Sequence, residues 1–180
     1  MFAIDVTDPT KLNASSILWD KKNQTEHALM ATFIGKPVIA RLNNGKWGII
    51  VGYGYNNSRH TSGLLVFDIA SGETLLNLPT SAGSASNPNA MSELNAIDLN
   101  ADGNVDYVYG GDLLGNVWKF DLSASQSSSW AIAYSGKPLF SAKDKNGAAQ
   151  MITGGVLATQ EPKTGQVWLF FGTGRYLNLD

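Results

Sequence analysis

The chain contains no cysteine among its 180 residues. This absence excludes disulfide bonds, thiolate-bound zinc and a cysteine nucleophile within the chain. No apolar run approaches the roughly 18 residues of a membrane-spanning helix, so no membrane span is predicted. The N-terminus also lacks the basic region and apolar stretch of a signal peptide. We expect Met1 to be an internal position of a longer protein, because residues 2–6 already alternate like the middle of a strand.

Charged residues are few, at 16% of the chain, with 13 basic and 15 acidic side chains and a formal net charge of −2. A weakly acidic balance without basic clusters offers no surface for phosphate, so we expect no nucleic-acid partner and no binding to an anionic membrane. Glycine, by contrast, is frequent, with 19 residues. A charge-poor chain rich in glycine and aromatic residues is typical of a β protein with many turns.

Apolar residues alternate with polar ones in runs of about four to eight residues, the spacing of β-strands. No eleven-residue window keeps a helical spacing, so we expect no helix longer than about two turns. Turn signals separate the runs, and two long polar segments, 81–89 and 123–129, are predicted to be surface loops. The predicted strands are 2–6, 17–19, 37–42, 47–53, 64–69, 74–78, 95–98, 105–110, 116–122, 130–134, 155–159 and 167–172.

Three segments share one form, a strand of aromatic and β-branched residues that ends in glycines. They begin at Trp47, Val105 and Val167, about 60 residues apart. Repeated units of short antiparallel strands at this spacing predict propeller blades, in which glycines let strands approach closely. We therefore predict an all-β fold with about three blades over residues 1–180. Because propellers usually need four to eight blades, the chain is expected to be a fragment of a larger domain. An open sandwich of two sheets is the alternative.

The clearest chemical signal is the segment 98–106, with the pattern D-x-N-x-D-G-N-x-D. Oxygen-bearing side chains at alternate positions of a tight coil face one point, and glycine at the sixth position permits the sharp turn. This pattern is the first half of an EF-hand loop, and it supplies the hard oxygen ligands that Ca²⁺ prefers. The predicted ligands are the side chains of Asp98, Asn100, Asp102 and Asp106 and the backbone carbonyl of Asn104.

The segment departs from an EF-hand in two ways. An EF-hand has a bidentate Glu at position 12, where this chain has Tyr109, and the flanks here are predicted strands. We therefore expect a calcium loop on a β scaffold, with Asp106 completing the shell of ligands. Mg²⁺ fits less well, because it usually retains several waters. A metal-free turn, held by Asn and Asp side chains that bond to their own backbone, is the alternative.

Other candidate sites have weaker support. His27 and His60 have no ligand partner at metal spacing, so both are expected to be surface histidines. No Gly-x-Ser-x-Gly motif indicates a hydrolase, and the Gly-x-Gly pairs do not precede a helix, as a nucleotide site requires. The tryptophans are expected to pack in the core or between blades; they are Trp19, Trp47, Trp118, Trp130 and Trp168.

Beyond the loop, residues 106–122 (DYVYGGDLLGNVWKFDL) closely resemble the signature of the PilY/PilC-type type IV pilus tip proteins, roughly D-x-x-Y-x-G-D-x-x-G-N-x-W-[RK]-F-D-L. The loop itself is similar to that family's calcium site. Residues 44–55 (NGKWGIIVGYGY) and 172–177 (GTGRYL) resemble two further family segments. Shorter stretches at 3–6, 138–140 and 150–153 also match, with Met151 where proline is usual.

The resemblance covers nearly the whole chain. It implies part of a modified β-propeller from the C-terminal half of an exported protein at the cell surface, outer membrane or pilus tip. It implies roles in pilus biogenesis, retraction control and adhesion, with pilus subunits or minor pilins and host-surface ligands as partners through the parent protein. Ca²⁺ is the implied cofactor, bound by the loop residues named above, and no enzymatic activity is expected.

Two other functions stay open. Residues 66–73 (VFDIASGE) resemble a docking element of quinoprotein-type dehydrogenase propellers, which would make the chain part of an enzyme. The element occurs clearly once, and its downstream tryptophan is missing. A generic calcium-loop adhesion propeller, similar to those of integrins, is the other alternative, and further calcium loops in the parent protein would favour it.

Overall fold

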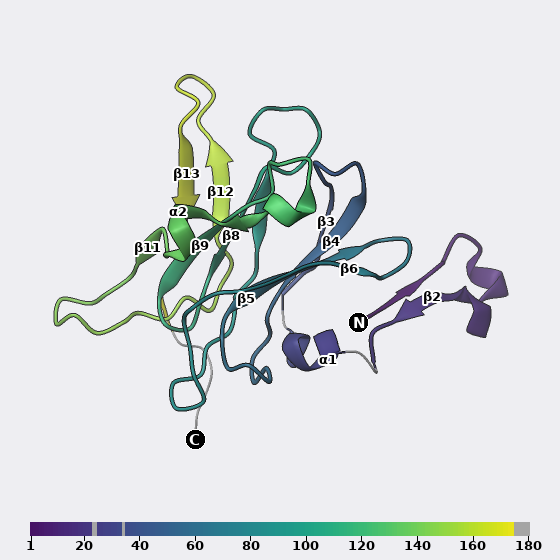
Figure 1. Cartoon of the computed structure of the whole chain (residues 1–180), viewed down its shortest axis with the longest axis horizontal. Coiled ribbons are helices and arrows are strands. Elements are labelled where there is room, and N and C mark those ends of the chain that lie inside the picture. The colour runs from purple at the N-terminus through teal and green to yellow at the C-terminus, as the bar shows by residue number, and fades with distance from the viewer. Residues whose placement is uncertain (23–24, 34, 175–180) are drawn as a thin grey trace.

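The computed structural model of the chain describes residues 1–22, 25–33 and 35–174. Within these residues the strands form successive antiparallel sheets (Figure 1). A two-stranded hairpin stands near each end of the chain, β1 (Phe2–Ile4) with β2 (Ile17–Asp20) and β12 (Leu157–Gln160) with β13 (Val167–Phe170). In Figure 1 these hairpins, purple and yellow, project on opposite sides of two larger sheets.

The first of the larger sheets, called the first blade below, has the strand order β3-β4-β5-β6. The two central strands are buried along almost their whole length, because other elements cover both faces of the sheet. The edge strand β3 instead alternates between half-buried and exposed residues. The strands are β3 (Val38–Arg41), β4 (Trp47–Gly52), β5 (Gly63–Asp68) and β6 (Thr74–Pro79).

The second blade has an interrupted outer edge. Two short strands, β10 and β11, pair with different halves of β9. Between them lies α2 (Ala133–Gly136), where Tyr134 (φ 56°, ψ 38°) and Ser135 (φ 57°, ψ 39°) are left-handed. Since left-handed residues turn the chain out of a strand, the strand predicted at 130–134 ends early. The strands are β7 (Asn95–Ile97), β8 (Tyr107–Gly111), β9 (Asn116–Asp121), β10 (Ala131–Ile132) and β11 (Phe140–Ser141).

The largest apolar cluster lies between the two blades, whose sheets pack face to face. It includes Ile50 and Val66 from the first blade and Val108, Trp118 and Phe120 from the second, all 0% exposed. Another cluster places β2 and α1 (Thr25–Met30) against the other face of the first blade, and a third packs the β12–β13 hairpin against the second blade. The predicted all-β, propeller-type arrangement is therefore confirmed.

The three repeated segments occupy equivalent places, because β4, β8 and β13 are each the second strand of their sheets. The glycines that end two of these strands allow a close approach. A Cβ added at Gly52 would lie 2.6 Å from Cβ of Met91, and one added at Gly110 would lie 2.7 Å from Sδ of the same residue. Met91 thus packs against both blades at once.

Helices are short throughout the described residues, as predicted. Beside α1 and α2, single 3₁₀ turns occur at η1 (Pro9–Lys11), η2 (Ala14–Ser16) and η3 (Ser127–Ser129). In this part of the chain, no helix has the length and apolar character needed to cross a membrane. Each predicted strand is present, with ends that agree to within about two residues, and β11 is an additional strand.

Two expectations about burial are wrong. The polar segment 81–89 is not all surface, because Asn89 is 1% exposed and donates a hydrogen bond to Asp112. A buried amide is stable where its donors find acceptors. Trp118 and Trp130 are buried as expected, but Trp47 and Trp168 are 54% and 50% exposed. Trp47 is the first residue of β4 and precedes its buried stretch, and Trp168 lies on β13, where half-buried and exposed residues alternate.

Candidate metal centre

The acidic loop, defined here as Asp98–Asp106, connects β7 to β8 in the second blade. The amide of Asp106 donates to the carbonyl of Ile97 at 3.0 Å, so strand pairing holds the two ends of the loop together. The apex at 100–103 is exposed, whereas Val105 and Asp106 are buried. The loop therefore lies between two strands of one blade, as the sequence predicts.

Side-chain oxygens hold the loop in a tight coil. The carboxylate of Asp98 accepts hydrogen bonds from the amides of Asp102 (3.2 Å) and Gly103 (2.7 Å). Oδ1 of Asn100 accepts from the amide of Asp102 at 2.9 Å. Oδ1 of Asp102 accepts from the amide of Asn104 at 2.8 Å. The side chains of Asp98, Asn100 and Asp102 thus each accept a hydrogen bond from an amide further along the loop.

The backbone of the coil needs two left-handed residues. Ala101 has φ 60° and Gly103 has φ 88°. A Cβ added at Gly103 would meet no atom within 4 Å. The glycine is therefore required by the backbone angle, which other residues adopt at a cost, and not by lack of space.

Asp106 approaches the coil from the opposite end of the loop. It is 5% exposed, and its Oδ2 accepts from the amides of Leu99 (2.9 Å) and Asn100 (3.2 Å). Its Oδ1 lies 3.5 Å from Nδ2 of Asn43. Because a buried carboxylate is costly without hydrogen bonds, these donors explain how the buried side chain is tolerated.

One buried oxygen in the loop has no such donor. Oδ1 of Asn104 is shielded from solvent and accepts no hydrogen bond from the protein. Unpaired buried oxygens are rare in native proteins, and a water or an ion often accounts for them. Asn104 is also the residue whose backbone carbonyl the sequence predicts as a ligand.

The acidic side chains are not gathered into a ready-made metal site. Across residues 1–22, 25–33 and 35–174, no three His, Cys, Asp or Glu side chains form a group that could hold a metal ion. The carboxylates of the acidic loop accept loop amides instead. A carboxylate has about four acceptor sites, so these amides leave capacity for a cation. The oxygen donors fit Ca²⁺, provided that the carboxylates turn toward a common point.

The two histidines lie away from the acidic loop. His27 is exposed on α1, and His60 is half-buried in the connection between β4 and β5. Neither residue adds a ligand to the candidate site.

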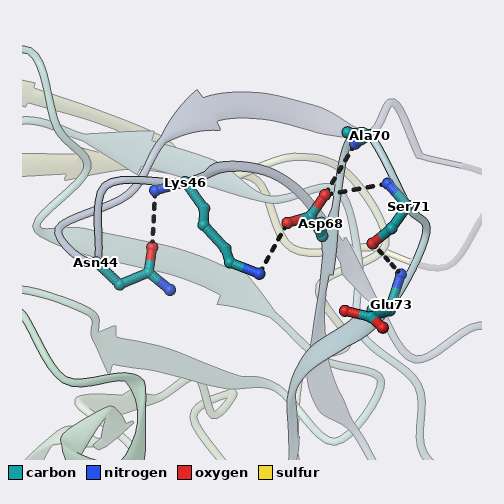
Figure 2. Close-up of polar contacts among 6 residues, drawn as sticks. All are labelled: Asn44, Lys46, Asp68, Ala70, Ser71 and Glu73. Atoms are coloured by element: carbon teal, nitrogen blue, oxygen red, sulfur yellow. Dashed lines mark hydrogen bonds and ion pairs between the residues drawn. The ribbon is translucent and has the colours of Figure 1, made fainter.

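The segment 66–73, which resembles a dehydrogenase docking element, ends β5 and forms the turn to β6 (Figure 2). Asp68 accepts from the amides of Ala70 (2.9 Å) and Ser71 (3.1 Å) and pairs with Lys46 Nζ at 3.0 Å. The amide of Ser71 and the ammonium of Lys46 hold the pKa of Asp68 below its usual value. These contacts are all within the first blade, where they close the turn.

A buried carboxylate that the sequence analysis did not single out joins the two blades. Asp112 is 0% exposed. Its Oδ2 accepts from Trp118 Nε1 (2.7 Å), Asn89 Nδ2 (2.9 Å) and Ser62 Oγ (3.3 Å). Its Oδ1 accepts two amides of its own turn, each at 2.9 Å. The sequence did hold a signal for this residue. Asp112 follows two glycines at a strand end in the family-like signature, and an Asp at a strand end often caps a turn.

Antiparallel sheets that pack face to face in series define a propeller-type β protein. The chain belongs to the PilY1 beta-propeller domain family, whose model matches residues 1–180. Residues 175–177 of the GTGRYL segment lie outside the described residues.

Two relatives illustrate the similarity. The chain is 38% identical over 189 residues to a "Type IV pilus biogenesis factor PilY1 homolog" of Xylella fastidiosa (strain Temecula1), covering 98% of this chain and 13% of that protein. It is 36% identical over 192 residues to the "Type IV pilus biogenesis factor PilY1" of Pseudomonas aeruginosa (strain PAO1), covering 98% of this chain and 16% of that protein. The chain thus spans a small part of the length of these relatives.

A solved structure has the same fold. The crystal structure of the Pseudomonas aeruginosa PilY1 C-terminal domain matches with a TM-score of 0.86 and 36% sequence identity. The match covers 99% of this chain and 38% of the solved chain.

Proposed function

We propose that the chain is a calcium-binding propeller segment of a type IV pilus biogenesis factor and that it catalyses no reaction. Family membership over residues 1–180, with relatives named as pilus biogenesis factors, supports the link to pili. The acidic loop carries the calcium assignment, because oxygen-bearing side chains stand at alternate positions of a coil closed by its own hydrogen bonds. The proposed ligands are the side chains of Asp98, Asn100, Asp102 and Asp106 and the carbonyl of Asn104.

The role proposed for the ion is to order the loop. Three carboxylates on one short loop repel one another, by a few kcal/mol at the effective dielectric of a surface site. A bound Ca²⁺ would neutralise this charge. Asp106 links the loop's end to its start through the amides of Leu99 and Asn100. An ordered loop therefore fixes the pairing of β7 with β8.

In the parent protein, we propose that this order influences pilus assembly, retraction and adhesion. The parent would be exported to the cell surface, outer membrane or pilus tip. Pilus subunits or minor pilins and host-surface ligands are its proposed partners. The chain would form part of a larger propeller, in keeping with its 38% coverage of the solved PilY1 domain.

Calorimetric titration with CaCl₂ tests the ion site. We expect one Ca²⁺ per chain in the wild type and loss of binding in Asp106→Ala. Asp144→Ala is the matched control, because Asp144 also accepts two turn amides, at 2.8 and 2.9 Å, but in a separate hairpin. Unchanged affinity in Asp106→Ala would contradict the ligand assignment.

The same logic applies in cells. Asp102→Ala in the full-length parent should alter surface piliation or twitching while the protein is still expressed, and Asp144→Ala should behave as wild type. If the Asp102→Ala strain assembled, retracted and adhered normally, calcium would have no part in pilus function.

A further inference from the structure

Asn43, in the turn between β3 and β4, connects the first blade to the acidic loop of the second. Its Nδ2 donates to the carbonyls of Val105 (2.9 Å) and Leu122 (3.1 Å) and lies 3.5 Å from Oδ1 of Asp106. An amide nitrogen carries two hydrogens. The two carbonyls therefore take the direct hydrogen bonds, and the contact with the carboxylate is the weakest of the three.

Backbone contacts reinforce this junction. The amide of Val105 donates to the carbonyl of Arg41 at 2.9 Å, and Leu42 forms a parallel bridge with Val105. The amide of Leu122 donates to the carbonyl of Asp106 at 2.8 Å. Asp106 is thus held between the β3–β4 turn, the end of β7 and the end of β9.

The other two carboxylates of the loop are placed differently. All three carboxylates accept amides of the loop, but Asp98 and Asp102 do so near its exposed apex. A cation that draws the three carboxylates together would find Asp98 and Asp102 free to adjust with the loop. The backbone of Asp106 is held on both sides by the ends of β7 and β9. Its position then decides where the ion is held.

We propose that Asn43 is a positioning residue for the calcium site and that, through it, calcium binding to the second blade stabilises the packing of the first blade against it. This inference rests on the proposed function. Asn43 holds the backbone just before Asp106 and the end of the strand that pairs with the segment after Asp106. The carboxylate of Asp106 is therefore already in position when the ion binds. Removing a group that orients a metal ligand typically lowers metal affinity by about 10–100-fold.

The first test is titration of the intact chain with CaCl₂. Asn43→Ala should raise the dissociation constant about tenfold, the low end of the typical range, because the direct contact with the carboxylate is long. Asn44→Ala is the matched control. Asn44 lies in the same turn, and its Oδ1 accepts from the amide of Lys46 at 3.1 Å. We expect its calcium affinity to equal that of wild type.

If Asn43 acted only in folding, Asn43→Ala would give a different result. It would lower the melting temperature equally in chelator and in saturating Ca²⁺ and leave the dissociation constant unchanged, and that result would overturn the inference. If the wild type binds calcium and Asn43→Ala binds it with the same affinity, only this inference is contradicted. Absence of calcium binding by the wild type would overturn the proposed function as well.

Hydrogen exchange of the wild-type chain provides a test that needs no variant. Saturating Ca²⁺ should slow exchange of the Val105 amide, because its acceptor, the carbonyl of Arg41, belongs to the first blade. Protection confined to amides of the coil, such as that of Gly103, would show that the first blade does not respond to the ion. That result would overturn the proposed coupling.

Discussion

Asp112 links residues from both blades through one buried carboxylate. Replacing it by Ala would leave Trp118 Nε1 buried without its acceptor and would remove one of the acceptors of Asn89 Nδ2. Because an unpaired buried donor carries a desolvation penalty, we expect Asp112→Ala to lower the free energy of unfolding by about 1–3 kcal/mol for the indole donor alone. Urea denaturation measures this change.

The control for this measurement is Asp144→Ala, which removes a carboxylate from a separate hairpin turn. It should change the free energy of unfolding by about 1 kcal/mol or less, in keeping with caps at solvent-facing turns. Equal losses of unfolding free energy in the two variants would show that the buried network stabilises the fold no more than an exposed turn does.

The ionisation of Asp68 should make the free energy of unfolding depend on pH. Folding lowers its pKa through the amide of Ser71, the ammonium of Lys46 and the amide of Ala70. Its stabilising contribution is therefore complete above the ordinary carboxyl pKa of about 4 and is lost as the pH falls through the lower folded-state pKa. Asp68→Asn should flatten this part of the profile of unfolding free energy against pH, measured by urea denaturation.

Lys46→Met separates the two causes of the Asp68 pKa shift. It removes the ion pair but leaves the amides of Ala70 and Ser71 in place. The part of the pH dependence that comes from the two amides should remain in this variant. If Asp68→Asn kept the wild-type profile of unfolding free energy against pH, another group would be responsible for the pH dependence.

At the scale of elements, the acidic loop depends on the backbone angle of Gly103. With φ 88° and no atom near an added Cβ, Gly103→Ala should cost about 1–2 kcal/mol from left-handed strain and weaken calcium binding. Gly154→Ala is the control, because Gly154 also has open space but no positive φ. Comparable stability and affinity of the two variants, by denaturation and calorimetry, would contradict the strain argument.

The outer edge of the second blade shows how an element can escape sequence analysis. Alternation predicts one strand at 130–134, but β10 ends at Ile132 and pairing resumes only at β11. Tyr134 and Ser135 adopt left-handed angles there. Neither residue type favours that conformation, so only tertiary contacts select it, and the residues themselves give no warning.

At the scale of the whole molecule, calcium should stabilise the chain. A ligand at a hundredfold excess over its dissociation constant adds about 2.7 kcal/mol. At about 2–4 °C per kcal/mol for a chain of this size, the melting temperature should rise by about 5–10 °C over that in chelator. Differential scanning calorimetry measures the shift. Asp102→Ala should abolish it, and identical midpoints with calcium and chelator in the wild type would contradict it.

The sequence by itself determined the strands, their turns and the coil of the acidic loop. These features depend on local physics, namely alternation along a strand, positive φ at Gly103, and side-chain oxygens that accept amides a few residues away. The repeat at Trp47, Val105 and Val167 even indicated equivalent strands, because each blade must present the same packing surface to its neighbours.

Only the tertiary structure decided which distant residues meet at the blade junctions. Asn43 lies 63 positions from Asp106, and Ser62 lies 50 positions from Asp112. No local pattern links such pairs, because their contact depends on how one sheet packs on the next. For the same reason the sequence assigned Asn89 to a surface loop, although packing buries it against Asp112. The chemistry of the loop is local, but its attachment to the first blade is a property of the fold.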